Sequence, residues 1–577
     1  MFARIAWLSL GHIALRLGLL TLLGVGVGVC ASLATMGFLQ GVSWLNRLFF
    51  AQPGIGWLAG VLAPVAGGLV VGLLVYRRKR VADADSSRAF NQPGPAQVVY
   101  AVQLREGMPP FVNGLRSSGA AFVSVACGAS VGILGPLIYL GAMVGQLAEK
   151  TRLPVSNLRA GALACGVAAA IATVFGAPIA GMLFAHEVLL RNFSVQVAAP
   201  VTLAAVSSYL LSQSLLGQSI WIGAEGGSSA FGSELLLFVF FGLACACIAI
   251  FFMRSLIWSA GWLERLPVPL WLRPAVAGML VGLVGLWLPD IASLSAGGVD
   301  LRELFSRYSG PEMALLLVVK ILLTSLCLGM GFVGGVFSPS LIIGLLFGGA
   351  FWWVLETLGL SNSGFDAYAL GGMMAVTSCV MGAPFATVLI VFEITRSYEL
   401  TIVAMVGVAF ANLLATRIFG RSYADVQLMR MGTDIRLGGE HALLHKRTIG
   451  KLVQPDGPSL RPEMRTSEAA HIMRMAGRNE AVVCDAAGVF VGVVRLIDLL
   501  EQKEQPIAGL LAENWPVLEQ TTSLWSAMNA MSDFVGEMVP VVDSDGGRLL
   551  GMVSEGAVMQ AYVEIVESSR ELHHASL

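Results

Sequence analysis

The stretch that decides the fold is GMGFVGGVFSPSL, residues 329–341. It interrupts a long apolar region with four glycines and one proline. Glycine lets the backbone turn where a Cβ would clash, and proline is preorganised for the first position of a helix. The stretch therefore predicts that one helix ends here and that a new helix starts at Pro339.

Composition places this region in a lipid bilayer. The chain of 577 residues is 56% hydrophobic and 13% charged, with a mean hydropathy of +0.75. Residues 160–186 contain no Asp, Glu, Lys or Arg, and a helix needs roughly 20 such residues to cross the hydrocarbon. We therefore expect a multi-pass membrane protein whose partner is the bilayer. The net charge of −1 and the lack of a long basic run argue against a nucleic-acid partner.

A second motif reveals an internal repeat. GAPIA at residues 176–180 is followed by Glu187, and the same pattern recurs 206 residues later as GAPFA at 382–386, followed by Glu393. Such spacing indicates two related halves, which we place at about residues 10–225 and 226–432.

The opening stretch also has a counterpart in the first half. GILGP, residues 132–136, aligns with it when Gly132 is set against Gly335, 203 residues later. Broken helices at matching positions are typical of transporters with inverted repeats and a site at the repeat interface. The predicted fold is therefore an all-α polytopic membrane domain of this kind.

Helix starts inside a membrane can bind an anion. A helix N-terminus presents free N–H donors and about half a positive charge, so two of them aimed at one point need no basic side chain. We predict such starts at Pro136 and Pro339, with Gly132 and Gly335 as the turns before them. The alternative is that both Gly-Pro steps only kink packed helices.

These motifs resemble those of the CLC chloride channel and transporter family. Residues 329–341 resemble its Gly-x-Phe-x-Pro signature, residues 132–136 resemble its Gly-Arg-Glu-Gly-Pro segment, and Tyr423 resembles its pore-lining tyrosine. The resemblance implies chloride contacts from the backbone amides of Val336 and Phe337 and from the Tyr423 hydroxyl. It also implies a homodimer with one pore per subunit in a bacterial-type cell membrane.

Two positions depart from the family pattern in ways that bear on mechanism. The resemblance puts Leu134, beside Gly135 in the anion path, where the family has its gating glutamate, and Val188 where it has an inner proton-transfer glutamate. The neighbouring Glu187 is then either a helix-end residue bonded to backbone or a residual proton carrier. The family's serine-containing loop corresponds to Gln92–Ala96, where the serine is missing.

The tail after residue 432 is predicted to be soluble, because charged residues appear there every few positions. We divide it into a linker (433–446), two repeated units (447–505 and 506–567) and a short end (568–577). Val482-Val483, Gly488 and Gly492 recur 59 residues later as Val541-Val542, Gly547 and Gly551. The units resemble a tandem CBS domain, a small α/β module.

In CBS domains a Ser or Thr followed three residues later by Asp holds an adenosine ribose. Here the resemblance leaves one half-motif in each unit, Asp498 in the first and Ser554 in the second. An adenine nucleotide and a purely structural dimerisation module both stay open. We expect no metal or other cofactor, since the eight cysteines show no metal-type spacing beyond Cys245-Ala-Cys247.

The basic cluster at residues 77–80 predicts the orientation. Lys and Arg are retained on the cytoplasmic side, which puts both termini in the cytoplasm. Three functions compete: a chloride channel or uncoupled anion transporter, a proton-coupled chloride antiporter, and an intramembrane enzyme. Leu134 and Val188 favour the first, and the lack of a motif such as His-Glu-x-x-His argues against the third.

Overall fold

The computed structural model describes most of the chain. The described residues are 2–50, 56–79, 94–104, 108–149, 158–193, 195–217, 222–223, 231–263, 266–288, 299–300, 306–360, 363–420, 422–430, 439–454, 459–502, 504–512, 514–532, 534, 536, 538–544 and 547–574. Gln92 and Pro93 of the predicted serine-loop counterpart, and residues 433–438 of the predicted linker, lie outside them.

The chain forms two compact units, residues Met1–Gly432 and Thr433–Ser576. The first is helical, and within its described part five helices are long and apolar enough to cross a membrane: Gly18–Phe50, Glu234–Trp262, Gly310–Gly329, Phe337–Thr357 and Tyr398–Met429. Shorter apolar helices lie between them. Helices that stop short are what a broken-helix membrane fold requires.

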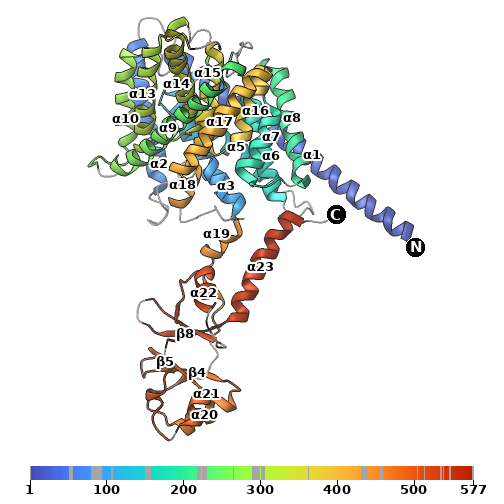
Figure 1. The fold of residues 1–577 in the computed structure, drawn as a ribbon, viewed down its shortest axis with the longest axis vertical. Coiled ribbons are helices and arrows are strands. Elements are labelled where there is room, and N and C mark those ends of the chain that lie inside the picture. The colour runs from blue at the N-terminus through green and yellow to red at the C-terminus, as the bar shows by residue number, and fades with distance from the viewer. Residues whose placement is uncertain are drawn as a thin grey trace. The chain divides into compact units, whose positions relative to one another are not determined.

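The elements of the first unit follow one another in this order (Figure 1): α1 (Phe2–Phe50), α2 (Gly56–Lys79), α3 (Pro95–Gln103), α4 (Phe111–Ala126), α5 (Leu134–Glu149), α6 (Leu158–Phe175), α7 (Pro178–Phe184), the π-helix η2 (Ala185–Leu190), α8 (Val195–Leu216), β1 (Ile222–Gly223), α9 (Phe231–Leu263), α10 (Arg273–Trp287), β2 (Val299–Asp300), α13 (Gly310–Gly329), α14 (Phe337–Thr357), α15 (Phe365–Met381), α16 (Pro384–Thr395), α17 (Tyr398–Ile418) and α18 (Tyr423–Arg430).

Glycines pack the two halves in the same way. A Cβ on Gly141 of α5 would lie 2.3 Å from the carbonyl oxygen of Gly166 in α6. In the second half, a Cβ on Gly344 of α14 would lie 2.2 Å from the carbonyl oxygen of Gly372 in α15. Backbones this close leave no room for a side chain, as in small-residue packing of membrane helices. The helix pairs α5–α6 and α14–α15 are therefore repeat equivalents, and almost all of α6 and α15 is buried.

The second unit contains two three-stranded sheets with the same topology. In the first, β3 (Ser459–Leu460) is parallel to β4 (Glu480–Cys484), which is antiparallel to β5 (Phe490–Arg495). In the second, β6 (Leu518–Glu519), β7 (Met538–Val542) and β8 (Leu549–Ser554) repeat that order. The helices are α19 (Gly439–Lys446), α20 (Thr466–Met475), α21 (Leu496–Glu501), α22 (Leu524–Met531) and α23 (Glu555–His574), with the 3-10 turns η3 (Ile449–Lys451) and η4 (Ile507–Gly509). The alternation produces the expected small α/β module.

The segments around the two units differ from the predicted boundaries. α19 falls within the predicted linker, and its Leu444 is buried with Ile449 in the core of the second sheet. Conversely, Ile507, assigned to the second unit, is buried in the core of the first and donates its amide to Met464. The core of the second sheet is thus completed by α19, which precedes both predicted units, and the core of the first by η4, which follows the predicted first unit.

Candidate functional site

The two signature stretches pair with each other. The Gly132 amide donates to the Gly335 carbonyl (2.7 Å), and the Gly335 amide donates to the Gly132 carbonyl (2.8 Å). The pairing is antiparallel, so the two halves run in opposite directions here, as inverted repeats must. The 203-residue correspondence read from the sequence is therefore a direct contact.

Only glycine fits at these positions. A Cβ on Gly132 would lie 2.5 Å from the Gly335 oxygen, and a Cβ on Gly335 would lie 2.8 Å from the backbone of Gly135. The breaks before them also need glycine, since Gly128 and Gly331 have φ values of +84° and +98°. L-residues with side chains rarely adopt such angles.

Both predicted helix starts lie next to this pairing, but the prolines do not occupy the first position. α5 begins at Leu134 and α14 at Phe337, so Pro136 and Pro339 are each the third residue. The first four N–H groups of a helix have no partner within the helix, so proline is tolerated throughout the first turn.

The predicted contact residues on α5 and α14 are closely packed. Leu134 and Phe337 are almost fully buried, whereas Val336 is partly exposed. The Leu134 amide donates to Ser338 Oγ (3.4 Å), which ties the two helix starts together. The Phe337 ring lies 6.0 and 5.9 Å from the rings of Phe175 and Phe184, so α14 is anchored to the first half.

Tyr423 is the first residue of α18, and it is half-buried. α18 packs against α3 and α15, and α15 packs along α14. α15 therefore lies against both α18 and α14. The helix that starts at Pro95, α3, packs against both α5 and α18.

Glu187 is held by the other repeat. Its carboxylate oxygens accept hydrogen bonds from the amides of Phe385 (3.0 Å) and Ala386 (2.9 Å) in the first turn of α16. This is the contact expected of a helix-end residue bonded to backbone, because carboxylates stabilise helix N-termini. The adjacent Val188 is buried and carries no ionisable group.

His186 precedes Glu187 in the π-helix η2 and was not assigned a role among the predicted site residues. It is 2% exposed, its Nδ1 lies 3.0 Å from the Asn192 carbonyl oxygen, and its ring stacks on Phe193. Its Nε2 is buried without a hydrogen-bond partner among the described residues. π-helical turns are frequent at functional sites, and His186 is a second titratable group, beside Glu187, within two residues of the predicted inner position Val188.

Lys320 was missed in the sequence. It lies in the middle of α13 and is 1% exposed. One turn later, Thr324 Oγ1 lies 3.1 Å from Ser130 Oγ, and Ser130 is two residues before Gly132. The signal was available, because Lys320 is the only charged residue between Glu312 and Glu356.

In the tail, both predicted nucleotide contacts have local partners. Asp498 accepts hydrogen bonds from Arg495 Nε (2.8 Å) and Nη2 (3.2 Å), and this pairing raises the pKa of Arg495 above its ordinary value. Ser554 Oγ accepts a hydrogen bond from the Ala557 amide (3.2 Å) and so caps α23. Both side chains stabilise the starts of their own helices.

Comparison with known proteins gives the family. The sequence model described as "Voltage gated chloride channel" matches residues 67–416. The chain belongs to this family, the CLC proteins. A CBS domain model matches residues 508–564, which agrees with the second α/β sheet of the tail. As a CLC protein the chain has anion transport as its class of function.

Curated CLC relatives are named either as chloride channel proteins or as H(+)/Cl(-) exchange transporters. A ClcB-like chloride channel protein of Ralstonia nicotianae is 28% identical over 66% of this chain and 90% of its own length. The H(+)/Cl(-) exchange transporter ClcA of Citrobacter koseri is 25% identical over 73% of this chain and 90% of its own. The fold matches a crystal structure of a slow cyanobacterial Cl-/H+ antiporter with a TM-score of 0.61 and 22% identity, over 71% of this chain and 97% of that one.

Proposed function

We propose that this CLC protein is a chloride channel or an uncoupled transporter of small anions. The observation that carries the proposal is the Gly132–Gly335 pairing, which brings the starts of α5 and α14 together. Each start offers first-turn amides to an anion. In the proposed path, chloride contacts the amides of Val336 and Phe337 and the Tyr423 hydroxyl. Leu134 and Gly135 border it as the gate.

The absence of proton coupling rests on two side chains. A carrier in the path must bind and release a proton, and neither Leu134 nor Val188 can do so. Glu187 does not replace them in this proposal, since its two oxygens accept the amides of Phe385 and Ala386.

A proton-coupled chloride antiporter is the second candidate, and His186 is the observation in its favour. Its buried Nε2 has no hydrogen-bond partner among the described residues, whereas Nδ1 lies 3.0 Å from the Asn192 carbonyl oxygen. Buried ionisable groups in membrane proteins often mark proton relays. The relatives are named as chloride channel proteins and as proton–chloride exchangers, so the comparisons do not choose between the two candidates. An experiment does.

The decisive experiment is reconstitution of the full chain into liposomes. Chloride efflux and internal pH are followed together, first without and then with a proton gradient. Uncoupled conduction predicts efflux that needs a potassium ionophore for charge balance and leaves the internal pH unchanged. Uphill proton movement driven by chloride would establish the antiporter, and its loss in His186→Gln would assign the carrier.

We further propose a homodimer with one path per subunit in the cell membrane, with both termini in the cytoplasm. The basic residues at 77–80 support that orientation. The tail would tune conduction. Because Asp498 and Ser554 each serve as a local helix partner, we favour a structural role for the tail over adenine nucleotide binding. Isothermal titration with ATP and AMP tests this, since nanomolar or micromolar binding would reverse the preference.

A further inference from the structure

The start of α18 is fixed by a reciprocal cap. The Ser422 hydroxyl donates to Asp425 Oδ2 (2.8 Å), and the Asp425 amide donates back to Ser422 Oγ (3.2 Å). Such a capping box sets the entry of the chain into the helix. Tyr423 lies between these two residues, so its backbone is held on both sides.

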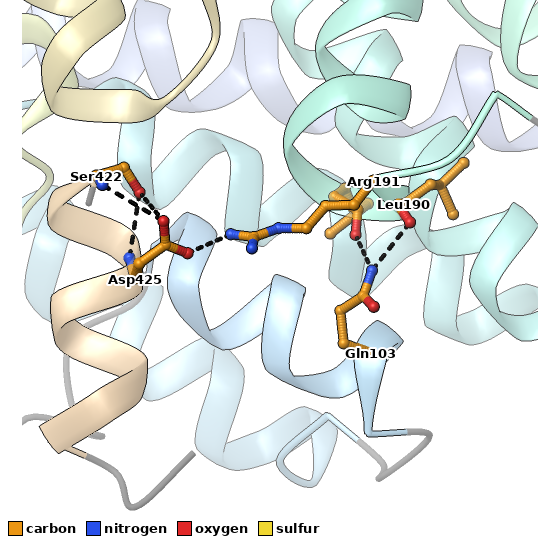
Figure 2. A network of polar contacts seen from close by, with 6 residues as sticks. Gln103, Leu190, Arg191, Ser422 and Asp425 are labelled. Atoms are coloured by element: carbon orange, nitrogen blue, oxygen red, sulfur yellow. Dashed lines mark hydrogen bonds and ion pairs between the residues drawn. The ribbon is translucent and has the colours of Figure 1, made fainter. Parts of the chain in front are cut away.

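The other carboxylate oxygen of Asp425 reaches a different repeat. Asp425 Oδ1 pairs with Arg191 Nη2 at the end of η2 (Figure 2). The side chains of Arg191 and Asp425 are 29% and 21% exposed, so the pair is only partly screened by water. Charge-assisted contacts of this kind hold geometry better than exposed ion pairs do.

η2 itself is tied to α3. The side-chain amide of Gln103 donates to the carbonyls of Leu189 (3.0 Å) and Leu190 (2.9 Å), as Figure 2 shows for Gln103 and Leu190. These are C-terminal carbonyls that a helix cannot satisfy internally. The ends of α3, η2 and α18 are therefore joined by side chains, and α3 also packs directly on α18.

We propose that Arg191 is a positioning residue for anion binding, which acts through Asp425 to hold the Tyr423 hydroxyl at the anion path. This inference rests on the proposed function, since it assumes that Tyr423 contacts the anion. Arg191 does not touch the anion. Its loss frees the first turn of α18 to shift, and the hydroxyl then no longer meets the site.

The second repeat supplies a matched control. Arg396 ends α16 as Arg191 ends η2, with φ of 51° against 52°. Arg191 pairs with Asp425, whereas Arg396 is exposed. Replacing each arginine by glutamine therefore removes the same charge from the same backbone conformation, but only one replacement removes the contact to α18.

The test is chloride binding to the detergent-solubilised full chain, measured by isothermal titration. Arg191→Gln should weaken binding about tenfold, as expected for loss of a contact to a charged group. Arg396→Gln should leave binding unchanged, and Arg191→Lys should recover part of it. Tyr423→Phe should also weaken chloride binding. Adding Arg191→Gln to Tyr423→Phe should weaken binding little further, because both changes remove the same contact between the Tyr423 hydroxyl and the anion.

Three results would overturn the inference. The first is wild-type chloride affinity in folded Arg191→Gln. The second is an equal loss of affinity in Arg191→Gln and Arg396→Gln, and the third is additive losses of affinity when Arg191→Gln is combined with Tyr423→Phe. A lower melting temperature with unchanged affinity would mark the ion pair as structural only, which also overturns it. Failure of the proposed function looks different, because it appears in the wild type: its liposomes would then show no anion flux, or chloride movement coupled to protons.

Discussion

Glu187 and Glu393 each cap a helix of the opposite repeat. Glu187 accepts the amides of Phe385 and Ala386, and Glu393 accepts those of Ile179 (2.9 Å) and Ala180 (2.7 Å). The two carboxylates occupy positions 206 residues apart in the sequence, so the exchange obeys the repeat symmetry. The same contact, a glutamate carboxylate that accepts two first-turn amides, therefore joins the two repeats at two places.

Glutamine at either position should destabilise the fold to a similar extent. A glutamine side chain has one acceptor oxygen, so one of the two amides loses its partner, at a cost of about 1–3 kcal/mol. We expect Glu187→Gln and Glu393→Gln to lower the thermal unfolding temperature by similar amounts in detergent. A change in the pH dependence of anion flux in Glu187→Gln alone would instead assign it a proton role.

Alanine at Gly335 should disrupt the pairing of the two signatures. Its Cβ would lie 2.8 Å from the backbone of Gly135, which cannot move as a flexible side chain could. We expect a loss of about 1–3 kcal/mol, typical of overpacking, and a loss of anion flux. Gly407→Ala is the control, since that Cβ would meet only Ala375 at 3.9 Å. Equal stability of both variants by thermal unfolding would contradict the close approach.

Lys320 should strengthen anion binding through its charge. A buried charge is only weakly screened by water, so the Lys320 ammonium favours an anion bound in the neighbouring path. We expect Lys320→Met to weaken chloride binding about tenfold, a loss of about 1.4 kcal/mol, and Lys320→Arg to preserve it. Isothermal titration measures both. If Lys320→Met binds chloride as the wild type does, the buried amine contributes no field at the site.

The sequence matched the two signatures as repeat equivalents but did not predict that they pair directly, nor the contacts around the pairing. The repeat could be recognised because glycines and prolines recur at a fixed spacing, and few structures other than a repeat explain such a pattern. Gly132 and Gly335 were matched on that basis. The ion pair between Arg191 and Asp425 joins residues 234 positions apart, and no local pattern marks it. The first helical residues, Leu134 and Phe337, were missed by two positions, since proline fits anywhere in the first turn.

Leu134 should control the rate of anion movement by its volume. It is 1% exposed at the start of α5, and an apolar side chain there can close a narrow path by excluding water. Leu134→Ala should raise chloride flux severalfold in liposomes. Leu134→Glu should add pH dependence without full exchange, because Val188 stays inert. Leu137→Ala, equally buried on the same helix, should only reduce stability, and a similar rise in its flux would contradict the gating role.

The tail should be dispensable for conduction if the cut respects α19. The predicted path residues all lie before residue 432, in a unit that is compact by itself. α19 belongs to the tail, since its Leu444 is buried in the core of the second sheet. A truncated chain that ends at residue 438 contains no residue of that core. A chain ending at residue 446 keeps α19 but exposes its apolar face, with Leu443 and Leu444, to water.

We therefore expect the shorter chain to purify as a folded dimer and to conduct chloride at a measurable rate, whereas the longer one should aggregate. Size-exclusion chromatography followed by liposome flux measures both properties. Altered flux in the shorter chain would fit a tuning role for the tail. Complete loss of transport in a folded 1–438 dimer would show that the tail is part of the conducting machinery.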